Sequence, residues 1–93
     1  MKHQRHFERA SDVASREAEQ IRTLIANLER TVRFLDCDIE TEQESAGVSD
    51  RADAAYPILA RTLAARSDNL KDTIAALEKR IVLSAFHRAV TAA

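Results

Sequence analysis

The only glycine and the only proline of this 93-residue chain, Gly47 and Pro57, stand ten residues apart near its middle. Glycine readily adopts the left-handed conformation that ends a helix, and proline is favoured in the first turn of the next helix. The sequence therefore predicts an all-α fold, an antiparallel two-helix coiled-coil hairpin that forms a single domain over residues 1–93. Helix one is expected at about 7–46, the elbow at 47–56 and helix two at about 57–90.

The composition is that of long helices. Aromatic residues make up 4% of the chain, tryptophan is absent, and charged residues make up 31%. So few large side chains cannot fill a thick core, whereas charged and aliphatic residues suit an elongated helical domain. The formal net charge of −1 gives no overall attraction to nucleic acid or to anionic lipid.

Apolar residues of the first half recur at alternating steps of four and three, which is a heptad pattern. Its most apolar part extends from Ile21 to Ile39. The whole stripe consists of Phe7, Ser11, Ala14, Ala18, Ile21, Ile25, Leu28, Val32, Leu35 and Ile39.

The second half carries a matching stripe, formed by Leu59, Leu63, Ser67, Leu70, Ile74, Leu77 and Ile81. Folding about the elbow pairs residues whose numbers sum to about 103, so that Leu77 lies near Ile25. Beyond Ile81 the register drifts, and the apolar face is expected to pass to Val82, Ala85, Phe86 and Ala89.

The predicted elbow is acidic, whereas the opposite end of the hairpin is basic. A helical turn of its own is expected over residues 49–54, capped by Ser49 or Asp50. The acidic cluster surrounds the single cation Arg51 and consists of Asp36, Asp38, Glu40, Glu42, Glu44, Asp50 and Asp53. A solvated helix face and a docking surface explain this cluster equally well.

Neither a metal site nor a cofactor site is expected. His3 and His6 could share a helical face, but the hairpin register puts His87 about 15 Å along the rod from His6. Cys37 lies between two carboxylates, which disfavour its reactive thiolate form, and is expected to face solvent. One glycine cannot form a glycine-rich phosphate loop.

Several short motifs resemble the flagellar export protein FliJ in the form found in alphaproteobacteria. They are Glu29-Arg30, Leu35-Asp36-x-Asp38-Ile39, Gly47-x-x-Asp50, Ala55-Tyr56-Pro57 and Arg66-x-Asp68-Asn69-Leu70. The resemblance covers roughly residues 13–86. Because coiled coils match one another by composition, the elbow motif of Gly47, Asp50, Tyr56 and Pro57 is the more specific part.

The resemblance implies a non-catalytic component of the type III export apparatus. Its partners would be the flagellar export ATPase and the export-gate membrane protein, and it would lie in the cytoplasm at the inner face of the cell membrane without inserting into it. Family members usually continue for several turns beyond the position of Ala93. We therefore expect measurable binding to the export gate or to a substrate-chaperone partner, and weak stimulation of the ATPase.

The resemblance places one candidate partner surface on helix two, at Leu59, Leu63, Arg66 and Leu70. The same leucines are also explained as seam residues packed against helix one, and both roles are compatible when one flank of the stripe stays open. Phe34 lies beside the stripe, where its ring either covers the edge of the seam or contacts a partner.

Two other functions are consistent with a hairpin of this kind. One is a self-associating interaction or regulatory module unrelated to export, such as a homodimeric four-helix bundle. The other is an RNA-binding hairpin that uses its basic end, which the acidic elbow and the near-zero net charge disfavour. The elbow motif favours export over self-association alone.

Overall fold

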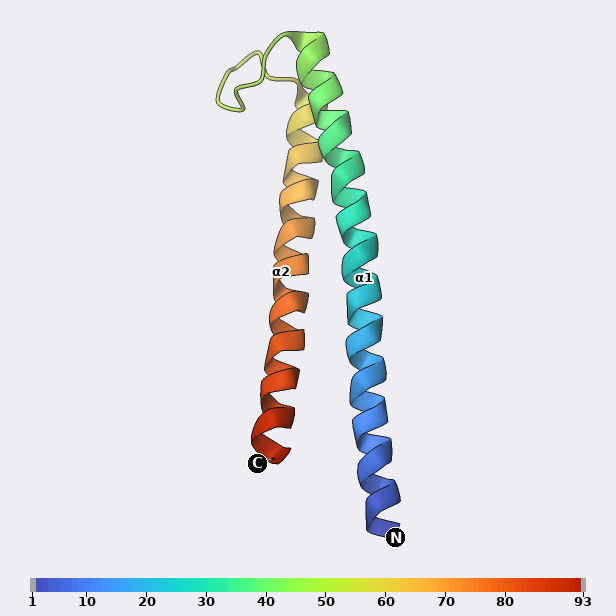
Figure 1. Ribbon diagram of the computed structural model, residues 1–93. Helices are drawn as coiled ribbons and strands as arrows, with labels where there is room; N and C mark the ends of the chain where they lie inside the picture. The colour runs from blue at the N-terminus through green and yellow to red at the C-terminus, as the bar shows by residue number, and fades with distance from the viewer. Residues whose placement is uncertain (1, 93) are drawn as a thin grey trace.

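The protein is an antiparallel hairpin of two long helices joined by an irregular connection. In the computed structural model, which describes the backbone of residues 2–92 and the side chains of residues 12–90, α1 spans Lys2–Ala46 and α2 spans Ile58–Ala92. The two helices lie side by side in a rod of 68 × 19 × 13 Å, and α1 extends past the end of α2 (Figure 1). The predicted fold class is confirmed, although α1 begins at Lys2 rather than near residue 7.

The core is a seam of aliphatic side chains between the helices. Ile25, Val32 and Ile74 are buried at its centre. Partly buried residues of both helices pack against these three, namely Ile21, Leu28, Leu70, Leu77 and Ile81. The central stripes therefore meet as predicted, and burying them is the main favourable contribution to folding of a rod this thin.

Near the elbow the seam differs from the prediction. Leu59 is 53% exposed, whereas Ala60 is completely buried and Ala64 nearly so. One residue corresponds to a rotation of about 100° around a helix, so facing Ala60 toward α1 turns Leu59 to the flank. The small side chains of Ala60 and Ala64 allow the two helix axes to come close together near the elbow. The prediction that Leu59 belongs to the seam is therefore wrong.

The seam also ends earlier than predicted. Every residue from 82 to 90 is exposed, including the large apolar side chains of Val82, Leu83, Phe86 and Val90. The ribbons of α1 and α2 diverge toward the end of the rod that carries the two termini (Figure 1). Residues after Ile81 thus do not continue the packing against α1, because their apolar positions have rotated away from it.

A polar contact lies beside the small residues of the seam. Ser67 is 1% exposed, and its hydroxyl donates a hydrogen bond of 2.9 Å to Oδ1 of Asp36 on α1. Lys71 Nζ lies 3.7 Å from Oδ2 of the same carboxylate. The residue numbers of Ser67 and Asp36 sum to the predicted register, so this contact joins positions that the heptad pattern pairs.

Replacing Ser67 with alanine is expected to lower the free energy of unfolding by about 1 kcal/mol, because it removes an interhelical hydrogen bond from a buried donor. Urea denaturation followed by circular dichroism measures the change. Ser84→Ala is the matched control, since Ser84 is an exposed serine of the same helix. Equal stability of the two variants would show that the Asp36 contact does not stabilise the hairpin.

Candidate docking surfaces

Helix α1 ends in a glycine cap. Gly47 has φ of +71°, and its N–H donates to the carbonyls of Gln43 and Glu44 at 2.8 and 3.3 Å. The N–H of Val48 also donates to the Gln43 carbonyl, at 3.3 Å. These bonds form a Schellman motif, which satisfies carbonyls that the end of a helix leaves without partners.

Replacing Gly47 with alanine is expected to cost about 1 kcal/mol, because a β-carbon disfavours the left-handed backbone. A β-carbon at this position would meet nothing within 4 Å, so the cost comes from conformation and not from a steric clash. We expect a melting temperature lower by several degrees, measured by circular dichroism. Asparagine tolerates this conformation better, so Gly47→Asn should be affected less, and the reverse order would contradict the explanation.

The connection after the cap consists of two successive turns built by aspartates. Asp50 accepts a hydrogen bond from the Ala52 N–H at 2.9 Å, and Asp53 accepts one from the Ala55 N–H at 2.8 Å. Backbone bonds from Asp53 to Asp50 and from Tyr56 to Asp53 close the turns. Asp50 thus caps the first turn as predicted, but residues 49–54 form no helical turn, because the aspartate side chains bond the backbone locally in place of helical bonding.

Tyr56 attaches the connection to both helices. The residue is 3% exposed, and its hydroxyl accepts a hydrogen bond of 2.9 Å from Nε2 of Gln43 on α1. The guanidinium of Arg61 on α2 lies 5.5 Å from the centre of the ring, which is cation–π distance. The carbonyl of Pro57 accepts the first helical bond of α2 from the Arg61 N–H.

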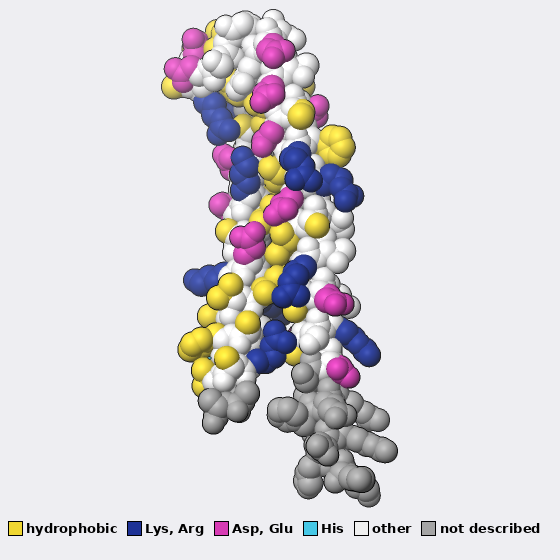
Figure 2. All heavy atoms as spheres, in the orientation of Figure 1, with side chains coloured by type: hydrophobic (Ala, Val, Ile, Leu, Met, Phe, Trp, Pro, Cys, Tyr) yellow, Lys and Arg dark blue, Asp and Glu magenta, His cyan; other side chains and the backbone are white. Residues whose placement is uncertain are grey.

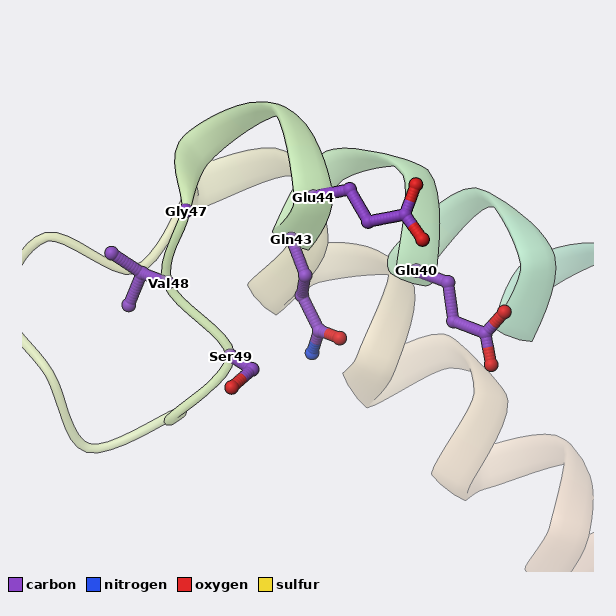
Figure 3. Close-up of a pocket in the computed structure, with 6 residues that line it drawn as sticks. All are labelled: Glu40, Gln43, Glu44, Gly47, Val48 and Ser49. Atoms are coloured by element: carbon purple, nitrogen blue, oxygen red, sulfur yellow. The ribbon is translucent and has the colours of Figure 1, made fainter.

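A shallow hollow of about 270 Å³ lies where α1 meets the connection. Gln43 reaches toward the segment that carries Ser49, whereas the carboxylates of Glu40 and Glu44 point away from that segment (Figure 3). Glu40 and Glu44 are both exposed. The hollow thus offers polar groups to a partner at the surface, without the enclosed apolar walls typical of small-molecule sites.

The predicted partner residues of α2 share one flank of the helix, because Leu59, Leu63, Arg66 and Leu70 recur at steps of four and three. Leu59 and Arg66 are exposed, and Leu63 and Leu70 are half-buried. Leu70 also packs against the core cluster. The flank is therefore an edge of the seam that remains partly open, which allows both roles for Leu63 and Leu70, whereas Leu59 lies on the flank alone.

Phe34 is separate from that flank, on the other helix. Its ring is 67% exposed, so it does not cover the edge of the seam. Contact with a partner stays a prediction for this residue. The contact of Asp36 with Ser67 was not predicted, although Ser67 interrupts the apolar stripe and Asp36 directly follows Leu35 in the seam.

The side chains of residues 12–90 include no group of three or more histidine, cysteine, aspartate or glutamate residues placed to hold a metal ion. His3 and His6 lie outside the described side chains. Cys37 is exposed, as predicted. Over the described part of the chain, neither helix has a segment long and apolar enough to cross a membrane.

Comparison of the chain with models of protein families, with curated proteins and with solved structures found no match.

Proposed function

We propose that this chain is a non-catalytic docking rod of the flagellar type III export apparatus, a FliJ-like protein that binds the export ATPase and the export-gate membrane protein. It would act in the cytoplasm, at the inner face of the cell membrane. It would contribute binding surfaces along the hairpin and no chemical step.

The elbow is the observation that carries this proposal. Three residues of the motif each have a structural role there: Gly47 caps α1, Asp50 forms the first turn and Tyr56 is buried between the helices. A heptad repeat does not require any of these residues, so the motif supports the resemblance more strongly than the seam does.

The surface chemistry supports a docking role over catalysis. Acid–base catalysis depends on carboxylates whose surroundings are shielded from water. Glu40 and Glu44 beside the elbow hollow are exposed to solvent. The open flank of α2 instead combines an exposed leucine, Leu59, with an exposed cation, Arg66, a pairing suited to a protein partner.

Binding of the purified hairpin to the export ATPase and to the detergent-solubilised gate protein tests the proposal. We expect measurable binding to at least one of them, and we expect Leu59→Glu to weaken it about tenfold or more. Ile58→Glu is the matched control, because Ile58 is the adjacent residue, is 83% exposed and points away from the flank.

Circular dichroism should show that both variants remain folded. Absence of binding to either export component would overturn the proposal. Equal loss of binding in the two variants would show that the flank of Leu59 is not the docking surface.

A further inference from the structure

Helix α2 carries a second stripe at alternating steps of four and three, on the side opposite α1. Its positions lie about half a turn around the helix from the seam. Each of its ten residues is exposed, and they are Ile58, Thr62, Ala65, Asn69, Asp72, Ala76, Lys79, Leu83, Phe86 and Val90. We name this set the outer stripe.

The outer stripe is apolar at both ends and charged near its middle. Ile58 lies at one end, and Leu83, Phe86 and Val90 lie at the other. Figure 2 shows hydrophobic side chains gathered over the end of α2 that is away from the elbow. As a result α2 is more apolar than α1, and its apolar residues are less confined to one face of the helix. A helix that is apolar on two faces is usually buried on both.

The charges of the hairpin are separated along its length. Residues 34–68, which surround the elbow, contain eight carboxylates and three cations. The rest of the chain contains seven carboxylates and eleven cations. The elbow end of the rod is therefore negative, and the end that carries the termini is positive.

We propose that the outer stripe binds a second copy of this chain in the antiparallel orientation, about a two-fold axis beside residues 72–76. This inference does not depend on a role in export. The antiparallel orientation places the negative elbow of each copy beside the positive end of the other, whereas a parallel dimer would bring like charges together.

The same axis makes the outer stripe complementary to itself. Ile58 of one copy lies opposite Val90 of the other, so the apolar ends meet. Near the axis, Asp72 of one copy lies within about one helical turn of Lys79 of the other. A two-fold interface also uses every apolar side chain twice, so four large exposed residues in each copy supply eight.

The first test is the mass of the full chain as a function of concentration, measured by analytical ultracentrifugation. We expect a monomer–dimer equilibrium. Phe86→Glu should raise the dissociation constant of the dimer about 100-fold. The substituted residue occurs twice in a two-fold interface, and each occurrence should weaken binding roughly tenfold.

Phe34→Glu is the matched control, since Phe34 is 67% exposed and Phe86 is 63% exposed. It should leave the dissociation constant unchanged. A monomer at every concentration would overturn the proposal, and so would equal weakening by both variants. Loss of binding to an export component by Phe86→Glu, in a chain that stays monomeric, would assign the outer stripe to that partner instead.

Disulfide cross-linking tests the orientation, in a Cys37→Ser background that removes the native thiol. Asp72→Cys and Ala76→Cys lie opposite each other across the proposed axis, so these two variants should form a disulfide between copies when they are mixed. Val90→Cys alone should not cross-link, because the two thiols would lie about 48 Å apart along the rod, but it should cross-link to Ile58→Cys in a mixture. Self-cross-linking of Val90→Cys would establish a parallel dimer and overturn the proposal.

Discussion

Replacing Ile25 with alanine is expected to lower the free energy of unfolding by about 2–5 kcal/mol. Ile25 is one of three buried residues at the centre of the core cluster, and the truncation removes apolar contacts on both helices while leaving a cavity. A domain of this size has a total stability of only about 5–15 kcal/mol. The variant should therefore melt at a much lower temperature and be partly unfolded under conditions in which the wild type is folded.

Ile58→Ala is the matched control, because the same atoms are removed from a side chain that is 83% exposed. Its stability should stay within about 0.5 kcal/mol of the wild type. Urea denaturation of dilute protein, followed by circular dichroism, measures both variants in the monomer. Equal destabilisation by the two substitutions would contradict the placement of Ile25 in the core.

Replacing Ala64 with leucine is expected to destabilise the hairpin by about 1–3 kcal/mol, although leucine is the better heptad residue. Ala64 is 2% exposed beside Ala60 and Ser67, where the seam has room only for small side chains. The larger side chain must either push α2 away from α1 or adopt a strained rotamer.

Ala75→Leu provides the control for this substitution, since Ala75 is an exposed alanine of the same helix. It should change the stability by no more than about 0.5 kcal/mol. The melting temperatures of the two variants, compared with that of the wild type, measure both effects. A more stable Ala64→Leu variant would mean that the helices near the elbow have space for a conventional leucine seam.

The heptad pattern predicted the middle of the hairpin well, because large aliphatic residues occupy matching positions on both helices there. It failed on both sides of that region for different reasons. Near the elbow the pattern predicted that the larger residue, Leu59, faces α1, but the closely packed helices have Ala60 in that position. Periodicity alone does not show which of these two adjacent residues faces the other helix. After Ile81 large apolar residues still occur, but Leu83, Phe86 and Val90 lie on the side of the helix away from α1 and are exposed.

In the elbow, too, some features could be predicted from the sequence and others could not. Gly47 predicted the end of α1 because a left-handed cap has a strong sequence preference. For the two aspartate turns the sequence predicts a helical turn, since Asp50 is equally suited to a helix cap and to a local turn. The burial of Tyr56 depends on Gln43, a residue thirteen positions away on the other helix, which no local pattern encodes.

Helix α2 is packed against α1 from the elbow to Ile81 and is exposed beyond it, and this difference affects the order in which the chain folds. The contact of Gln43 with Tyr56 closes a loop of 13 residues, that of Asp36 with Ser67 closes one of 31, and the contacts of Ile25 with α2 close longer ones. Short loops cost the least entropy to close, so the hairpin should zip from the elbow outward. Within α2, unzipping should begin where residues 82–90 already face water, and amide hydrogen exchange should be faster there than at the centre of the seam. The turn would then act as the nucleus of folding, and the divergent ends would be the first part to open under heat or force.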